Sequence, residues 1–252
     1  MEETKEYKIR FHHMIWLFIF GCVLGVIAEG IFTLFDRGVW ESHVTFLWGH
    51  LNIVYGAGAC LTYVVANSIK KNSVFVMFVV YMILASVIEW LAGFVEEELL
   101  NSTAWNYGDM GPLVIAKYIS VPFSLAWGVL GILFIKFILP LLEKLFMKMN
   151  GKGWVIAAWI VTAFMIVNFI LSMYSFYRWG YRETCYTEKQ YKEFVVKKPD
   201  KASELRKVEV PNRKPVYVKD KKPTNTIDKF FDETWPDEFM HHRYMEWVLD
   251  DK

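Results

Sequence analysis

The chain has 252 residues, of which 54% are hydrophobic and 17% aromatic, with a mean hydropathy of +0.23 and a net charge of +1. Ordinary soluble domains carry about 45–50% apolar residues, so this composition excludes that class and predicts a membrane protein. The balanced charge gives no reason to expect a nucleic acid partner, and Cys22, Cys60 and Cys185 show neither metal spacing nor a disulfide framework.

Five apolar runs are long enough to cross a bilayer, which takes about 20 residues. The predicted spans are 13–35, 46–68, 73–95, 118–140 and 154–176. The first run is longer than the apolar part of a signal peptide, so we expect it to be retained. The predicted fold is therefore an all-α, multi-pass membrane bundle of about five transmembrane helices, covering residues 1–176.

Basic residues near the span ends predict the orientation. One side carries eight of them: Lys5, Lys8, Arg10, Lys70, Lys71, Lys144, Lys148 and Lys152. The other side carries five: Arg37, Arg178, Arg182, Lys189 and Lys192. Since cytoplasmic loops are enriched in Lys and Arg, a cytoplasmic amino terminus in the inner or plasma membrane is predicted. The basic residues after the fifth span argue the other way, and a re-entrant segment within 38–50 would also move the tail to the other side.

Two carboxyl side chains stand late in apolar runs, Glu29 in "VIAEGIF" and Glu89 in "SVIEWLAG". A carboxyl group at membrane depth is costly and points to a functional site. With the spans laid antiparallel, polar residues of all five fall at one depth, which predicts a polar cavity in one half of the bilayer. Its candidate residues within the spans are Glu29, His50, Asn52, Tyr55, Glu89, Ser124 and Asn168. The alternative is that these residues only fix helix packing, and without a spacing such as HxxxH or ExxH we expect no metal site.

The loop "EEELLNSTAWNYGDMGP" after the third span is acidic and rich in aromatic residues near its end. We expect it to cover the cavity with Trp105, Tyr107 and Asp109, and Lys117 to pair with a carboxylate. The alternative is an interfacial anchor with a solvated run of charges.

The first pair of spans is similar to the second. "VIAEGIF" corresponds to "VIEWLAG", and "IVYGAGACL" corresponds to "LAWGVLGIL", with aromatic-glycine pairs at Tyr55-Gly56 and Trp127-Gly128. Small residues of this kind allow helices to approach closely. The correspondence predicts a tandem two-helix repeat, as occurs in some transporters.

These stretches also carry a resemblance to the ABC-transporter type IV family, called CmpB-like, of small bacterial membrane proteins. It rests on the acid of the first span, on "WGHLNIVYGAGA", on "EW" followed by "WNY", on "FSLAWGVLG" with "KFILP", and on "IDKFFDETWPDEFM" near the end. The resemblance covers most of the chain and implies a permease subunit. Because the sequence has no GxxxxGK[ST] phosphate loop, any ATPase is expected to be a separate partner.

Residues 177–252 form a predicted polar tail in which charged and aromatic residues alternate without a strong core. "YTEKQYKEFVV" predicts a short helix and "RKVEVPNRKPVYVKD" a hairpin. "FDETWPDEFMHHRYMEWVL" predicts an amphipathic aromatic segment broken at Pro236, which docks on the membrane surface or caps the bundle. The adjacent His241 and His242 are expected at the surface.

Three functional classes follow. The first, which we favour, is a transporter or permease component with a polar cavity. The second is an intramembrane enzyme acting on a lipid or lipid-linked substrate, with Glu29, Glu89, His50 and Asp109 as acid–base candidates. The third is a scaffold or regulatory subunit. No cofactor is expected, and the expected partners are the lipid bilayer, a separate ATPase or other membrane subunit, and a second copy of the chain.

Overall fold

The computed structural model describes residues 9–100, 102–103, 106–108, 113–209, 214–245 and 248–249. The helices are α1 (Phe11–Arg37), α2 (Ile53–Ile69), α3 (Val74–Leu100), α4 (Val121–Leu133), α5 (Leu139–Lys148), α6 (Lys152–Arg182), α7 (Glu188–Lys197), α8 (Thr226–Thr234) and α9 (Asp237–Arg243). A π-helical turn, Phe134–Ile138, joins α4 to α5, and a 3₁₀ helix, Pro199–Glu204, follows α7. The strands are β1 (Ser102–Thr103), β2 (Val114–Ala116), β3 (Ile119–Ser120), β4 (Glu183–Tyr186), β5 (Arg206–Val208), β6 (Val216–Asp220) and β7 (Val248–Leu249).

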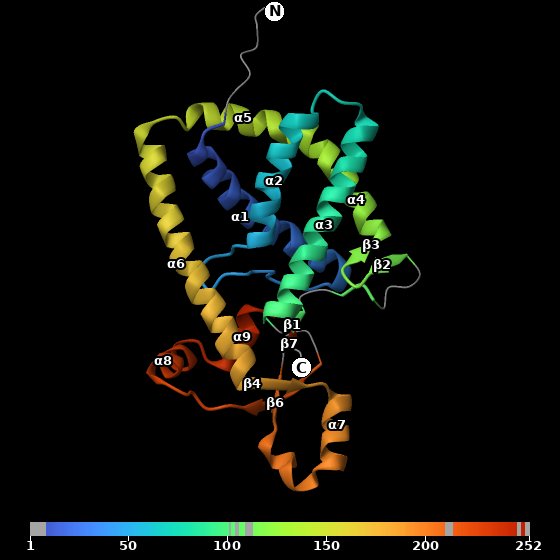
Figure 1. Cartoon of the computed structure of the whole chain (residues 1–252), viewed down its shortest axis with the longest axis vertical. Helices are drawn as coiled ribbons and strands as arrows, with labels where there is room; N and C mark the ends of the chain where they lie inside the picture. The colour runs from blue at the N-terminus through green and yellow to red at the C-terminus, as the bar shows by residue number, and fades with distance from the viewer. Residues whose placement is uncertain are drawn as a thin grey trace, which may run out of the picture. The chain divides into compact units, whose positions relative to one another are not determined.

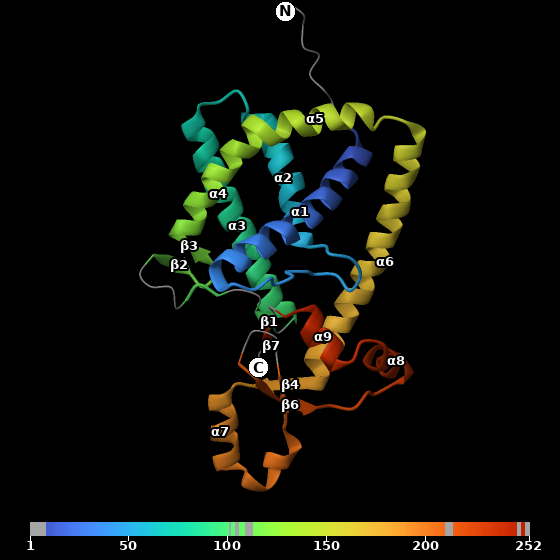
Figure 2. The same cartoon turned by 180° about the vertical axis from the view of Figure 1, so that it is seen from behind.

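The chain, drawn in Figures 1 and 2, divides into two compact units, and α1, α3 and α6 each contribute to both. The first unit comprises Met1–Gly25, His50–Leu91 and Tyr107–Val167. The second unit comprises Val26–Gly49, Ala92–Asn106 and Asn168–Lys252.

The predicted all-α membrane bundle is confirmed. Within the described residues, four helical segments are long and apolar enough to cross a membrane: Phe11–Arg37, Val74–Glu98, Val121–Lys148 and Lys152–Arg182. The fifth apolar helix, α2, has 17 residues, which at 1.5 Å each is about 25 Å and short of the roughly 30 Å hydrocarbon layer.

The predicted start of the second span, at residue 46, is wrong, because α2 begins at Ile53. Side chains from distant segments of the second unit bind the backbone of residues 46–49. Ser172 Oγ accepts from the Leu47 N–H at 2.8 Å, and Arg243 Nη2 donates to the Phe46 carbonyl at 2.8 Å. Backbone groups held by side chains in this way are not available for a helical ladder.

The fourth span also differs from its predicted bounds. Residues 118–120 are not helical, and Ile119–Ser120 pairs with β2 in a short hairpin. The helical segment then continues past Pro140 to Lys148, where the prediction ended it. Proline lacks the N–H for the helical ladder and clashes with the preceding turn, so the helix bends there instead of stopping. Consequently α5 leaves the line of α4 at a steep angle (Figures 1 and 2).

The predicted repeat is supported by matching contacts within the first unit. A Cβ atom on Gly56 of α2 would lie 2.9 Å from the Phe18 ring of α1, and one on Gly128 of α4 would lie 2.6 Å from the Phe78 ring of α3. Both phenylalanines stand eleven residues before the glutamate of their own helix, and both glycines follow an aromatic residue. Within each pair, α1 with α2 and α3 with α4, the two helices therefore approach closely, and they do so at equivalent positions.

Gly56→Ala should destabilise the first unit by about 1–3 kcal/mol, the usual cost of overpacking. The added methyl group would lie 2.4 Å from the Sγ atom of buried Cys22 and 2.9 Å from Phe18. Gly58→Ala is the matched control, because nothing lies within 4 Å of its Cβ position and alanine favours the helix over glycine. Thermal unfolding in detergent measures both, and equal midpoints for the two variants would contradict the close packing.

The predicted elements of the tail are confirmed. The short helix is α7, and the hairpin is β5 paired antiparallel with β6, which also pairs with β4. The aromatic segment is broken at Pro236 into α8 and α9.

The expectation that the tail lacks a strong core is wrong. In the second unit, Trp179, Val218 and Met240 are fully buried in one apolar cluster with Tyr244. The cluster takes residues from α6, β6 and α9, which are distant in the sequence. Their short apolar stretches form a core only when the strands and helices are brought together.

Candidate functional site

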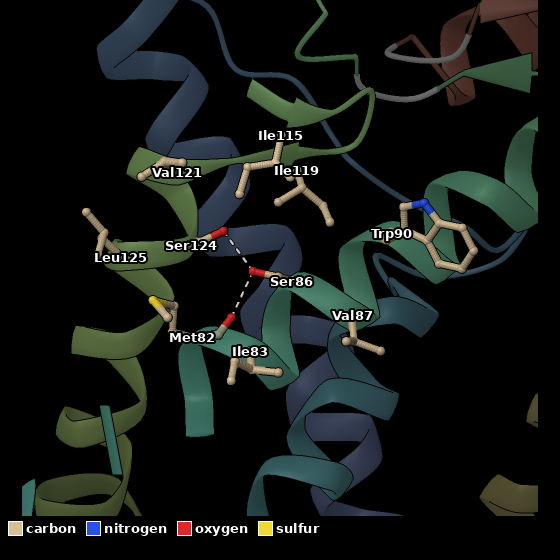
Figure 3. Close-up of a pocket in the computed structure, with 10 residues that line it drawn as sticks. All are labelled: Met82, Ile83, Ser86, Val87, Trp90, Ile115, Ile119, Val121, Ser124 and Leu125. Carbon is tan, nitrogen blue, oxygen red and sulfur yellow. Dashed lines mark hydrogen bonds between the residues drawn. The ribbon is translucent and has the colours of Figure 1, made fainter. Parts of the chain in front are cut away.

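An apolar groove lies in the first unit between α3 and α4, beneath the β2–β3 hairpin, with a cavity volume of about 570 Å³ (Figure 3). Its described lining residues are Met82, Ile83, Ser86, Val87 and Trp90 from α3 and Ile115, Ile119, Val121, Ser124 and Leu125 from the hairpin and α4. Ser120 precedes α4, and Pro122 lies in its first turn, where a proline suits the helix start. The chain therefore turns directly from the hairpin into the wall of the groove.

The only polar side chains among the described lining residues, apart from the Trp90 ring nitrogen, are two hydroxyl groups that point toward one another, Ser86 and Ser124 (Figure 3). Their oxygens are 2.7 Å apart, and Ser86 Oγ also donates to the Met82 carbonyl at 2.8 Å. A hydroxyl group has one hydrogen. Because Ser86 donates its hydrogen to the Met82 carbonyl, the Ser86 oxygen must accept the hydrogen bond from Ser124. Ser124 is left with lone pairs, and it can only accept from a ligand.

Glu89 lies three residues after Ser86 on α3, so the two side chains are neighbours on the helix surface. Tyr107 Oη donates to Glu89 Oε1 at 3.2 Å, and the Tyr107 ring stacks on Phe123 at 5.0 Å. The Tyr107 N–H donates to the Lys117 carbonyl at 2.9 Å. The segment that follows α3 thus returns to the glutamate of that helix and holds a tyrosine against it.

The polar end of this region offers acceptors. The Ser124 hydroxyl has no hydrogen to spare, Tyr107 has given its own to Glu89, and a carboxylate only accepts. A molecule with an apolar chain and a donor-bearing head group, above all an ammonium group, matches this arrangement.

Three other candidates of the first unit have structural roles. Asn52 Oδ1 caps α2 by accepting from the Val54 N–H at 2.9 Å. The Tyr55 ring fills the space beside Gly25 of α1, where a Cβ atom would lie 2.1 Å from it. The Lys117 ammonium lies 5.2 Å from the centre of the Tyr118 ring, a cation–π contact. His50 is exposed just before α2.

In the second unit, Asn168 binds the backbone of Trp48. The Trp48 N–H donates to Asn168 Oδ1 at 3.2 Å, and Asn168 Nδ2 donates to the Trp48 carbonyl at 2.9 Å. The side chain is fully buried. Asn168 therefore orders the loop that follows α1. Of the remaining candidates, Trp105 and Asp109 lie outside the described residues.

Glu29 lies close to a residue of the segment that follows its own helix, and the same is true of Glu89. His43 Nδ1 lies 4.0 Å from Glu29 Oε2, and His43 Nε2 lies 3.7 Å from Glu41 Oε2. The Glu41 side chain is 1% exposed and accepts from Arg37 at 2.8 Å, while its other oxygen has no hydrogen-bond partner within the described part of the chain. This end of α1 therefore brings together two carboxylates, a histidine and an arginine, of which the sequence pattern singled out only Glu29.

A larger set of charged side chains, most of them buried or nearly so, was missed from the sequence and lies in the second unit. This ionic cluster contains the guanidinium groups of Arg178, Arg182 and Arg206 and the carboxylates of Glu183, Asp228, Asp232 and Asp237. Arg178 binds Asp232 through Nε at 3.1 Å and Nη2 at 2.7 Å, and its Nη1 lies 3.2 Å from Asp228. The signal was present: two arginines four apart near the end of the fifth span, and two aspartates four apart in "IDKFFDET".

At the other end of the ionic cluster, Arg206 Nη2 bridges Asp237 at 2.7 Å and Glu183 at 3.3 Å. His241 Nε2 lies 2.8 Å from Glu183 Oε2. His241 is 5% exposed, so the expectation that it lies at the surface is wrong, whereas His242 is exposed. The two histidines are neighbours on α9 and therefore point in different directions.

Burial and the neighbouring carboxylate of Glu183 raise the pKa of Asp237 to about 7, against the opposing effect of Arg182. Burial also opposes the ionisation of Glu183, but the hydrogen bond and charge of His241 outweigh it, and the pKa of Glu183 is lowered. Three arginines face four carboxylates in the ionic cluster, which is consistent with one carboxyl group retaining its proton near neutral pH.

The family comparison agrees with the resemblance noted in the sequence. The model of the family described as "Putative ABC-transporter type IV" matches residues 16–173. No curated protein and no solved structure gave a significant match. The matched region contains most of α1, all of α2 to α5 and most of α6, and therefore the whole α3–α4 groove.

Proposed function

This chain belongs to the ABC-transporter type IV family, and from that premise we propose that it is a permease-type membrane component that binds a cationic amphiphile. The apolar chain of the ligand lies in the α3–α4 groove. Its donor-bearing head group, such as a primary ammonium, lies toward Ser124 and Glu89.

The observation that carries this proposal is the division of the groove into apolar walls and an acceptor end. Eight of the ten described lining residues are hydrophobic, and the other two are the serines whose hydrogens are already committed. An ammonium group can only donate, which suits the Ser124 oxygen, and its charge is opposite to that of the Glu89 carboxylate. A ligand carrying an anionic head group would place like charges together.

The groove favours binding over catalysis. Glu89 lies beside the groove and accepts from Tyr107, but among the described residues neither lining serine has a base as its hydrogen-bond partner. A serine nucleophile needs such a base within hydrogen-bond reach. We therefore place the permease ahead of the lipid-modifying enzyme, with energy supplied by a separate ATPase, since the sequence has no phosphate loop of its own.

Glu89→Gln should weaken the binding of dodecylammonium about tenfold or more, and Ser124→Ala should weaken it about fivefold. The loss of affinity is larger for Glu89→Gln because a hydrogen bond to a charged acceptor contributes more than one to a neutral acceptor such as Ser124. Trp90 lines the groove, so a dodecylammonium brominated on its chain should quench the Trp90 fluorescence, obtained as the difference between the parent and Trp90→Phe in nanodiscs.

Brominated dodecanoate, of equal chain length and opposite charge, is the control ligand. Saturable quenching by the ammonium and weak, unsaturable quenching by the carboxylate are expected. Equal quenching by both would show that the groove takes only acyl chains and would contradict the proposed head-group site. Quenching that is the same in Glu89→Gln as in the parent would remove Glu89 from it.

A further inference from the structure

Helix α8 has one face that packs against α6 and another that is exposed. On the inner face, Tyr174 Oη donates to Asp228 Oδ1 at 2.7 Å, and the Tyr174 ring lies 4.6 Å from that of Phe231. Beside this face, Ile227 and Phe230 are 62% and 57% exposed. Apolar side chains three residues apart share one side of a helix, so they form a continuous strip.

The remaining side of α8 is charged. Lys229 and Glu233 stand four residues apart, and their side chains lie 3.7 Å from one another. The helix therefore carries an ionic inner face, an apolar strip and a charged strip. A helix lying in a membrane interface has this division, with apolar residues toward the acyl chains and charged residues toward water.

The last turns of α6 carry a row of aromatic side chains with a lysine beside it. Tyr177 is exposed, and its ring lies 5.9 Å from that of Tyr174 and 6.3 Å from that of Tyr181. The Lys221 ammonium lies 5.2 Å from the centre of the Tyr181 ring, and the Lys221 N–H donates to the Arg182 carbonyl at 2.7 Å. Lys221 is thereby held at the end of the transmembrane helix, next to exposed Lys222.

The length of α6 sets the depth of this surface. Its 31 residues extend about 46 Å, which exceeds the roughly 30 Å hydrocarbon layer and matches a bilayer with its head groups. The last turns of α6 therefore lie among lipid head groups, where tyrosines are enriched. Because α8 packs beside these turns in both views (Figures 1 and 2), it lies at the same level.

We propose that Ile227 and Phe230, together with Tyr177, Tyr181, Lys221 and Lys222, form a lipid-binding surface for anionic phospholipid. The acyl chains contact the strip of α8, and Lys221 and Lys222 bind the phosphate. The inference is independent of the α3–α4 groove. Lysines near a membrane surface attract anionic lipid, which makes the bilayer around α6 a better match than a soluble protein partner.

Photo-cross-linking of the full chain in vesicles tests the surface. The photoreactive residue p-benzoylphenylalanine replaces Ile227 or Phe230, and in the control it replaces Glu233 on the charged strip of the same helix. Both test positions are exposed, so the larger side chain is accommodated. We expect phospholipid adducts from 227 and 230 and few from 233. In vesicles mixing phosphatidylcholine and phosphatidylglycerol, the adducts should be enriched in phosphatidylglycerol.

Lys221→Gln and Lys222→Gln should lower that enrichment by about fivefold for each lysine removed. Cross-linked dimers from position 230 would overturn the proposal in favour of a second copy of the chain. Equal lipid adducts from 230 and 233, or adducts that show no preference for phosphatidylglycerol, would also overturn it.

Discussion

Arg178→Met is expected to release α8 and α9 from α6, at a cost of about 3–5 kcal/mol, the usual effect of removing one partner of a buried ion pair. The Arg178 side chain is 2% exposed and binds Asp232 through two nitrogens and Asp228 through a third. Methionine fills similar space without supplying a charge. The two aspartates then remain buried beside α6 with one arginine fewer.

Hydrogen exchange followed by mass spectrometry measures this effect on the intact chain, in the amides of residues 226–243. Lys192→Met is the matched control, because Lys192 pairs with Glu188 at 2.8 Å but both side chains are exposed. An exposed pair contributes little, about 0–1 kcal/mol, so α8 and α9 should stay protected in that variant. Equal protection in parent and Arg178→Met would show that apolar contacts alone hold these helices.

The second large effect is a loss of stability of the second unit as the pH rises toward 7. Burial and nearby Glu183 raise the pKa of Asp237 from 3.8 to about 7, so the folded state holds this proton more tightly than the unfolded chain. Its contribution is complete below about pH 4 and is lost as the pH rises through about 7. In this window the free energy of unfolding should fall by at most about 1.4 kcal/mol per pH unit.

Asp237→Asn separates this proton from the other charges. Asparagine stays neutral, its carbonyl oxygen can accept from Arg182, and its amide nitrogen can donate to Glu183 as the protonated Asp237 does. The variant should therefore lose the pH dependence and lie close to the parent at low pH. The midpoint of unfolding is measured for the parent and for Asp237→Asn at pH values from about 5 to about 8. Glu183 does not confuse the result, because its lowered pKa affects stability only below its ordinary value of 4.5. If the free energy of unfolding of the parent protein rose between pH 5 and 7, the neighbouring arginines would be keeping Asp237 ionised, and the prediction would be wrong.

The membrane helices could be predicted from the sequence because the length and hydropathy needed to cross a bilayer are properties of each segment by itself. Length and hydropathy placed the starts of α1, α3 and α6 to within two residues, whereas their ends were predicted two, five and six residues too early. The start of α2 was misplaced because nothing within residues 46–52 reveals that Ser172 and Arg243 bind the backbone of that loop. The end of the fourth span was misplaced because a proline can bend a helix or end it, and neighbouring packing determines which.

The sequence identified Glu89, Tyr107 and Ser124 of the candidate site one by one, but not the contacts among them. The depth of Glu89 in an apolar run identified it, but not the hydrogen bond from Tyr107 eighteen residues later. Asn52 and Asn168 looked equally functional in the sequence. Only the structure shows that they serve backbone groups, one at the start of α2 and one at Trp48. The direction of the Ser124–Ser86–Met82 hydrogen bonds also depends on where α3 and α4 meet.

Tertiary structure alone decided the arrangement of the tail. Its helices and hairpin follow from local turn and helix signals, which short-range backbone preferences determine. Arg178 and Asp232 are 54 residues apart, and no local preference pairs them. They meet because α8 packs along the end of α6, where burial removes water and makes each charge depend on the one brought opposite to it.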